Sequence, residues 1–303
     1  MTGEGRRIAV LCGGLGGSRC VDSLARAAGA EAVTAIGNVG DDLELLGVHI
    51  SPDLDTVLYT LAGLLDEERG WGVGDETYNA LGMARELGGE SWFTLGDRDI
   101  GLHLVRTSWL REGLPLSAAT LRLAEALDVR VRLLPATDEP LRTKIQTKDG
   151  ELDFQEWFVA RAHRDAVTGL RYDGAEAARP APGVLEAIEA AELVVIAPSN
   201  PFVSIWPILA VPGIQEALAA KHVAAVSPLV GGEAFRGPLA EMMASLGHEP
   251  SAAGVAALYG DLLDVFVVAP GDQGPVGAIE CEIDMVAPDR RAEVGRRLLE
   301  ALL

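Results

Sequence analysis

The sequence has few cysteines and no long apolar run, and each absence narrows the class of protein. Its 303 residues include three cysteines, at positions 12, 20 and 281, which are too few and too scattered for a disulfide framework or a zinc site. They are consistent with a reducing compartment. No apolar run approaches the roughly 20 residues that cross a membrane, and no basic-then-apolar leader opens the chain. We therefore expect a cytoplasmic protein without a membrane partner.

Basic residues are also scarce. The chain has 25 lysines and arginines against 45 acidic residues, which gives a formal net charge of -20. Because such a chain repels a phosphate backbone, nucleic acid is not an expected partner. An anionic ligand would need a local positive site or a metal ion. Hydrophobic residues make up 49% of the chain, which is enough for a sizeable core.

Short apolar runs alternate with helical segments near both ends of the chain. A glycine-rich turn and a helical stretch at residues 18–28 separate the first two runs, which is typical of a β-loop-α-β unit. The predicted strands are residues 7–12, 32–37, 193–197, 223–226 and 265–268. We predict an α/β fold, a Rossmann-like, doubly wound and mostly parallel sheet, with residues 1–303 forming a single domain.

The middle of the chain has a different pattern. It is helical from about residue 99 to residue 128, and then two strand-like runs, 143–147 and 152–159, flank an Asp-Gly pair that predicts a hairpin. We expect residues 97–180 to form a helical and β-hairpin subdomain inserted in the α/β domain. Further local predictions are a helix at residues 75–87 with Asp75 as its N-cap, a strand at residues 92–95, a helix at residues 118–127 capped by Ser117, and a half-exposed strand at residues 279–285.

The glycine-rich turn, GGLGG at residues 13–17, directly follows the first predicted strand. Glycines there would let backbone N–H groups approach a phosphate at a helix N-terminus. The turn is neither a P-loop nor a clean G-x-G-x-x-G, so a ligand cradle and a purely structural tight turn are equally good interpretations. Neighbouring Ser18 and Arg19 favour the ligand. The candidate phosphate-binding residues are Gly13, Gly14, Gly16, Gly17 and Ser18.

Four aspartates cluster in two loops soon after this turn, namely Asp41, Asp42, Asp53 and Asp55. Mg²⁺ typically takes one or two carboxylates together with substrate phosphates and water. The structural alternative is that these residues cap a helix and form a turn, but capping explains one aspartate rather than four. We therefore predict that at least one of them is a magnesium ligand.

Three further polar sites have two interpretations each. Arg98, within Gly-Asp-Arg-Asp at residues 96–99, either pairs with its neighbours or binds an anion, with His103 and Arg106 on a related helix face. Ser199-Asn200 and Ser227 follow predicted buried strands, where ligands of open α/β sheets bind. Turn chemistry alone would also place such residues there. One shared crevice is the better explanation.

Taken in order, these motifs form a recognisable set. The set comprises residues 13–17, 38–42, 51–56, 70–72, 95–99, 134–138, 154–157, 197–201 and 227–228. The chain resembles the 2-phospho-L-lactate transferase family (CofD/FbiA) of coenzyme F420 biosynthesis, nearly end to end. Each motif is weak alone, whereas the set is specific.

The resemblance implies a Rossmann-like core and a Mg²⁺-dependent transfer. The donor would be a guanosine diphosphate ester of a three-carbon acid, 2-phospholactate or phosphoenolpyruvate, and the acceptor the deazaflavin alcohol Fo, with GMP released. It implies that Asp55 and Thr94 contact Fo, while the glycine turn, Ser199-Asn200 and Ser227 hold the guanosine phosphates. Asp42, Asp53 and Asp55 are the catalytic candidates, as metal ligands or as the acceptor of the hydroxyl proton. A homodimer is common for such folds.

Two other functions are compatible with the residues. A sugar-nucleotide-binding regulatory protein of the gluconeogenesis-factor kind shares the glycine turn, but this chain also has Ser-Pro-Asp-Leu-Asp and Gly-Asp-Arg-Asp. An NAD-dependent oxidoreductase ranks last, because residues 37–38 end the second predicted strand without the acid that binds a ribose. No residue evidently distinguishes lactate from enolpyruvate or glycerate.

Overall fold

The structure is a computed structural model that describes residues 6–231, 233–234 and 237–303. In these ranges the central sheet has seven strands, all parallel, in the order β14-β13-β10-β9-β1-β2-β5. Its strands are β1 (Ile8–Cys12), β2 (Val33–Gly37), β5 (Arg132–Pro135), β9 (Leu193–Ile196), β10 (Val223–Val226), β13 (Val265–Val268) and β14 (Ile279–Glu280). The predicted α/β fold class is confirmed.

The chain winds outward from β1 in two directions. It first runs from β1 to β2 and β5, and then returns to the other side of β1 as β9 before continuing to β10, β13 and β14. The order therefore reverses between β1 and β9, which pair in register from Ile8 with Leu193. Ligands of open α/β sheets bind beyond the carboxyl ends of the strands at such a reversal.

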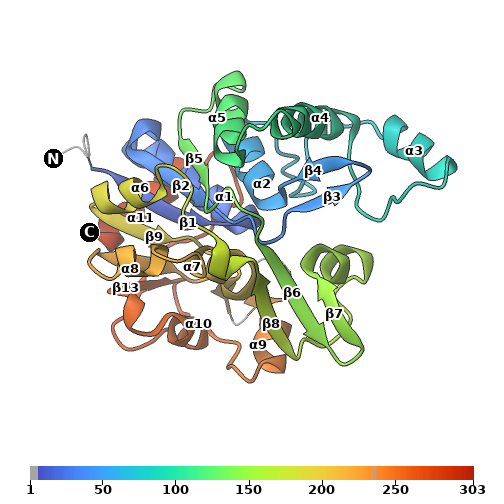
Figure 1. The fold of residues 1–303 in the computed structure, drawn as a ribbon. Helices are drawn as coiled ribbons and strands as arrows, with labels where there is room; N and C mark the ends of the chain where they lie inside the picture. The colour runs from blue at the N-terminus through green and yellow to red at the C-terminus, as the bar shows by residue number, and fades with distance from the viewer. Residues whose placement is uncertain (1–5, 232, 235–236) are drawn as a thin grey trace.

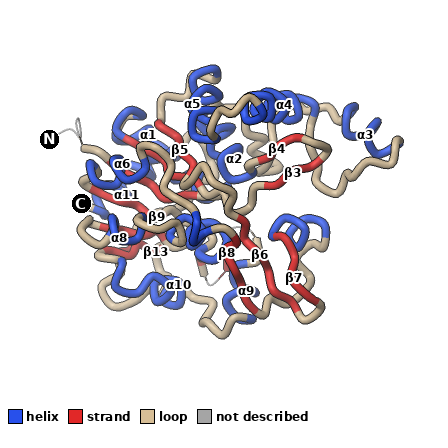
Figure 2. Tube along the Cα trace, viewed as in Figure 1, coloured by secondary structure: helices blue, strands red, loops and turns tan. Residues whose placement is uncertain are grey.

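Helices surround the strands of this sheet (Figure 2). The first helix, α1, packs against α2 and the closing helix α11. The helices are α1 (Gly14–Ala28), α2 (Pro52–Leu61), α3 (Asn79–Glu86), α4 (Asp97–Arg111), α5 (Leu116–Ala126), α6 (Val184–Ala190), α7 (Trp206–Leu209), α8 (Ile214–Leu218), α9 (Leu239–Ser245), α10 (Ala252–Tyr259) and α11 (Arg291–Leu302). Shorter helical turns lie at Ala30–Ala32, Glu156–Ala160, Ala175–Ala177, Pro201–Ile205 and Gly260–Leu262. Over the described residues, none of these helices is both long and apolar enough to span a membrane.

The middle of the chain adds smaller sheets. An antiparallel three-stranded sheet, β7-β6-β8, extends from the side of the molecule away from both termini (Figure 1). Its strands are β6 (Arg142–Thr147), β7 (Gly150–Asp153) and β8 (Gly169–Asp173), and the two-stranded pairs are β3 (Leu43–Leu45) with β4 (Val48–Ile50) and β11 (Leu229–Val230) with β12 (Glu233–Ala234). Residues 97–180 thus contain α4, α5 and the three-stranded sheet, and also β5 of the central sheet.

Several local predictions were wrong, and capping from distant residues explains two of them. The helix expected at residues 75–87 begins at Asn79, because the Asp97 carboxylate accepts the N–H groups of Asn79 and Ala80. Asp75 itself has a φ of 54° and lies outside this helix, whose N-cap position is Tyr78. Ser117 is not an N-cap, since α5 begins at Leu116 and Asp138 accepts the Ser117 N–H at 2.6 Å.

Two predicted strands end early and one is absent. β7 stops at Asp153, where the chain enters the helical turn Glu156–Ala160. β14 covers only Ile279–Glu280, although burial continues to alternate as far as Met285. Residues 92–95 form no strand; Trp92 and Leu95 instead pack in a small cluster with β3 and β4. In these segments the pattern of hydrophobic residues predicted which side chains are buried, but it did not predict which residues pair as strands.

Candidate active site

The glycine turn and the loop after β9 meet at the reversal point of the sheet. The Ser199 hydroxyl donates to the Gly13 carbonyl at 2.8 Å and accepts the Gly13 N–H at 3.2 Å. The first strand ends at Cys12 and the helix begins at Gly14, so the glycines form its first turn rather than a separate loop. The two segments expected to hold phosphates are thus adjacent.

The glycines of this turn are required by their neighbours. A Cβ on Gly13 would lie 2.2 Å from Oδ2 of Asp53, and one on Gly16 would lie 2.3 Å from the carbonyl oxygen of Pro198. Gly14 has a φ of +61°, which disfavours a side chain. The tight-turn interpretation therefore accounts for the glycines by itself, and phosphate binding by this turn stays a prediction.

Asn38 joins the two acidic loops, residues 38–42 and 51–55. Its amide nitrogen donates to Oδ1 of Asp41 at 3.2 Å and to Oδ2 of Asp53 at 2.9 Å, and it also contacts the Val203 carbonyl. Asn38 is fully buried. Asn38 directly follows the last residue of β2. The end of this strand therefore sets the position of the amide that holds the two carboxylates together. Asn38 was not among the residues predicted for the site.

Burial and mutual repulsion make Asp41 and Asp53 reluctant to ionise together. Burial raises the pKa of Asp53 to about 6, against the hydrogen bond from Asn38 and the Gly14 N–H. The pKa of Asp41 is raised well above its ordinary value by burial and then by the charges of Asp53 and Asp42. Two such carboxyl groups in one place favour a shared proton or a bound cation.

The two carboxylate oxygens of Asp42 have different surroundings. Its Oδ2 accepts the Ser51 hydroxyl at 3.0 Å and lies 3.2 Å from Nε2 of His49. Its Oδ1 is buried and has no hydrogen-bond partner among the described residues. A buried carboxylate oxygen without a partner is costly unless a ligand completes it. His49, which the sequence did not assign, therefore orients this aspartate.

Asp55 faces a different environment. Arg106 of α4 binds both of its carboxylate oxygens, and Ser51 donates its backbone N–H to Oδ2 at 3.1 Å. His103 lies 3.7 Å from Asp55 and 3.1 Å from Asp99. The anion expected beside His103 and Arg106 is therefore the Asp55 carboxylate of this chain.

A cleft of about 670 Å³ opens beside Asp41 and Asp42. Besides the acidic loop, β6 and the segment after β7 contribute to its wall. The lining residues are Gly40, Asp41, Asp42, Leu43, Glu44, Glu90, Trp92, Arg142, Thr143, Lys144, Asp153, Phe154, Gln155, Glu156 and Ala160. The strand β6 was predicted as part of a hairpin and not as part of the site, because the alternation of burial at residues 142–145 is not visible in the residue types Arg-Thr-Lys-Ile.

The remaining predicted residues lie in turns or on the surface. Ser227 is buried and its hydroxyl is bonded to the Leu229 backbone, while Asn200 caps the helical turn Pro201–Ile205. Thr94 is exposed. Arg98 is exposed and donates to the Gly74 carbonyl at 2.7 Å. Their predicted contacts with ligand stay predictions.

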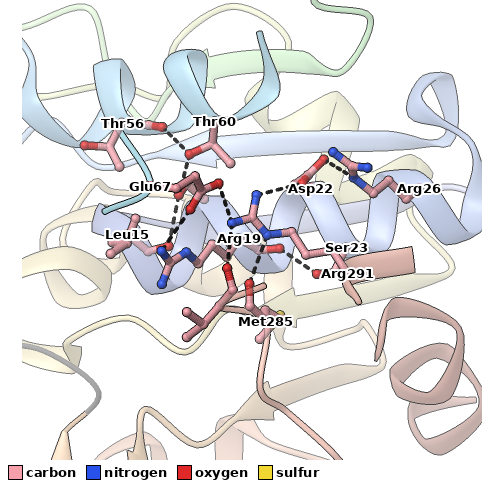
Figure 3. A network of polar contacts seen from close by, with 12 residues as sticks. Leu15, Arg19, Asp22, Ser23, Arg26, Thr56, Thr60, Glu67, Met285 and Arg291 are labelled. Carbon is pink, nitrogen blue, oxygen red and sulfur yellow. Dashed lines mark hydrogen bonds and ion pairs between the residues drawn. The ribbon is translucent and has the colours of Figure 1, made fainter. Parts of the chain in front are cut away.

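Ser18 and Arg19 point into the protein. Ser18 is fully buried, and its hydroxyl accepts from Thr60 at 2.9 Å. Arg19 pairs with Glu67 at 2.9 Å, and Glu67 also binds Arg291 of α11 (Figure 3). Arg291 completes the network by reaching Asp22 at 3.1 Å. This network ties α1 to α11, and the part that Arg19 plays in it is structural.

The acidic loops fit a hard cation that a substrate would help to hold. In the described part of the chain, no three histidine, cysteine or acidic side chains are arranged to hold a metal ion by themselves. Mg²⁺, however, needs only one or two carboxylates when phosphates and water complete its shell. Asp41 and Asp53, both buried and both with raised pKa values, supply the right donor chemistry.

Comparison with known proteins adds relatives over nearly the whole chain. A phosphoenolpyruvate transferase from Streptomyces griseus is 44% identical, with 97% of this chain and 98% of that protein covered. A 2-phospho-L-lactate transferase from Methanosarcina mazei is 38% identical, with 89% of each covered. Two solved structures of a Bacillus halodurans protein, one described as a UPF0052 family member, share the fold with TM-scores of 0.56 and 0.59 at 17% and 18% identity, over 89% of this chain and 82% of each of theirs.

The family model described as 2-phospho-L-lactate transferase CofD matches residues 8–297, from the first residue of β1 into α11. The match thus includes the glycine turn, both acidic loops and the wall of the cleft. The chain belongs to the CofD family and is a transferase.

Proposed function

We propose that this protein transfers a phospho-(three-carbon acid) group, 2-phospholactate or phosphoenolpyruvate, from its guanosine diphosphate ester to Fo in coenzyme F420 biosynthesis. A new bond forms between the terminal ribityl hydroxyl of Fo and the phosphorus that bears the acid. The bond from that phosphorus to the bridging oxygen of the diphosphate breaks, and GMP leaves. The names of relatives at 38–47% identity support the transferred group.

One observation carries the proposal: buried carboxylates gather where the sheet reverses, beside an open cleft. Asp41 and Asp53 share the Asn38 amide, and Oδ1 of Asp42 has no hydrogen-bond partner among the described residues. Phosphoryl transfer needs charge neutralisation and in-line positioning more than a strong base. A bound Mg²⁺ would neutralise the diphosphate, and Asp41 and Asp53 are the residues that would hold it.

The other side chains position and deprotonate the acceptor. Asp42 accepts the hydroxyl proton at Oδ1, while Ser51 and His49 hold its Oδ2. Asn38 keeps Asp41 and Asp53 together. Asp55, fixed by Arg106, contacts Fo from the side of α2, as does Thr94 on the segment before α4. A homodimer and a cytoplasmic location are further parts of the proposal.

Release of GMP tests the proposal. Wild-type protein, Fo and each guanosine diphosphate ester should give GMP in Mg²⁺ and none in EDTA. Asp42→Asn should lower turnover about 10²- to 10⁴-fold, the range of a lost general base. Asp128→Asn is the matched control, because Asp128 is exposed at the end of α5. If the wild-type protein bound UDP-sugar or NAD and did not bind Fo, the result would contradict the proposal.

A further inference from the structure

The cleft beside the acidic loop is strongly negative except along one strand. Six carboxylate side chains line it, at Asp41, Asp42, Glu44, Glu90, Asp153 and Glu156. Among the described lining residues the basic ones are Arg142 and Lys144, both on β6. Every other charged residue that lines the cleft is acidic and repels an anionic group that enters it.

The two cations lie on the same face of β6. They are two residues apart, so their Cα atoms are roughly 7 Å apart and their side chains point the same way. Thr143, between them, faces the other side and is buried. Each of the two basic residues is half-buried, which reduces screening by water. A single carboxylate can reach both side chains.

Neither cation is firmly committed to a partner in the protein. Arg142 forms no ion pair with the described residues, and its Nη1 donates to the Leu141 carbonyl at 2.8 Å. Lys144 pairs with Asp153, whose side chain is 60% exposed. Exposed pairs of this kind are worth at most about 1 kcal/mol, so a ligand can replace Asp153.

The strand that carries the cations is anchored to the acidic loop. The Thr143 N–H donates to the Gly40 carbonyl at 2.5 Å, and Nε2 of Gln155 donates to Oδ2 of Asp41 at 2.9 Å. The position of β6 relative to the carboxylates is therefore fixed by direct bonds. A substrate whose phosphates lie at the acidic loop would place its next group against β6.

We propose that Arg142 and Lys144 form the subsite for the carboxylate of the three-carbon acid on the donor. This inference rests on the proposed function. In both 2-phospholactate and phosphoenolpyruvate the ester oxygen joins the phosphorus to a carbon atom, and that carbon also carries the carboxylate. The carboxylate therefore lies close to the phosphorus. The subsite therefore selects for an acid carboxylate and discriminates against a nucleoside diphosphate that lacks one.

Titration calorimetry with two ligands tests this inference. In Mg²⁺, Arg142→Gln and Lys144→Gln should weaken binding of the guanosine diphosphate ester of phosphoenolpyruvate about 10- to 100-fold, the loss of a charge-assisted hydrogen bond. GDP affinity and the KM for Fo should stay within twofold. Asp153→Asn frees Lys144 and should tighten ester binding more in the wild-type background than in Lys144→Gln, a difference that the loss of one cleft carboxylate alone would not produce. Lys148→Gln is the matched control, since Lys148 is exposed in the turn after β6 and is not among the residues that line the cleft.

The outcomes separate the inference from the proposed function. Unchanged ester affinity in Arg142→Gln and Lys144→Gln, with an active wild type, would overturn the subsite alone. Equal loss of GDP affinity would assign the cations to the diphosphate, and a raised KM for Fo would assign them to the acceptor; either result overturns the inference. A wild type that neither binds the ester nor releases GMP would overturn the proposed function itself.

Discussion

Arg106 donates its two terminal nitrogens to the two carboxylate oxygens of Asp55, and this bidentate pair joins α4 to α2. Both side chains are buried, with 2% and 4% of their surface exposed. A bidentate guanidinium fixes both the charge and the orientation of a carboxylate. The protein therefore holds the Asp55 carboxylate in one orientation, whereas the nearby Asp41 and Asp53 share the amide of Asn38.

Arg106→Met should lower the free energy of unfolding by about 3–5 kcal/mol, because it leaves the buried Asp55 carboxylate without its partner. Arg98→Met, on the exposed part of the same helix, should change it by less than about 0.5 kcal/mol. The double variant Asp55→Asn with Arg106→Met should recover part of the loss. Urea denaturation of all four proteins measures this, and a loss below about 1 kcal/mol in Arg106→Met would contradict the expectation.

The raised pKa of Asp53 makes its effect on stability depend on pH. Its pKa moves from an ordinary value of 3.8 to about 6, so the stability it contributes is complete below pH 3.8 and is lost as the pH rises through 6. In EDTA, Asp53→Asn should therefore gain stability relative to wild type as the pH rises from 4.5 to 7, by roughly 2 kcal/mol.

Asp97→Asn provides the control for that pH series. The pKa of Asp97 is lowered to about 2 by bonds from Thr77 and the start of α3, so its contribution is lost only as the pH falls through that value. The difference in free energy of unfolding between Asp97→Asn and wild type should be constant from pH 4.5 to 7. Denaturation midpoints over this range check both variants; a constant difference for Asp53→Asn would show that its carboxyl group is not perturbed.

Gly16→Ala should destabilise the protein, because the new Cβ would lie 2.3 Å from the Pro198 carbonyl oxygen at the reversal point of the sheet. The cost of overpacking is typically 1–3 kcal/mol. Gly101→Ala in α4 is the control, since its Cβ would meet nothing within 4 Å. Because alanine favours a helix more than glycine does, this change should raise the free energy of unfolding by about 0.5–1 kcal/mol. Thermal unfolding distinguishes the two; equal midpoints would mean that the loop of Pro198 yields freely.

GDP and Fo should differ in whether their binding requires Mg²⁺. With a net charge of -20, the protein should repel GDP until Mg²⁺ is present, whereas uncharged Fo should bind measurably in EDTA. Titration of each ligand in EDTA and then in excess Mg²⁺ checks this. Equal GDP affinity in the two conditions would remove a metal-bridged diphosphate from the mechanism.

The sequence by itself determined the α/β core and the family. Apolar runs such as Ile8–Cys12 and Val223–Val226 predict buried parallel strands, because such strands are covered on both faces. The glycine turn and the acidic loops were identifiable because their residue types are unusual at strand ends. Local order of this kind is written in consecutive residues, so periodicity and motifs report it directly.

Tertiary structure decided which polar groups meet. The pairing of Asp55 with Arg106 joins residues 51 positions apart, and the bond from Gln155 to Asp41 spans 114 positions. The start of α3 was also set from a distance, by Asp97. Such partners are chosen by the packing of whole elements, for which a single sequence has no local signal. Fold and family could therefore be predicted from the sequence, while the arrangement of charges around the cleft required the folded chain.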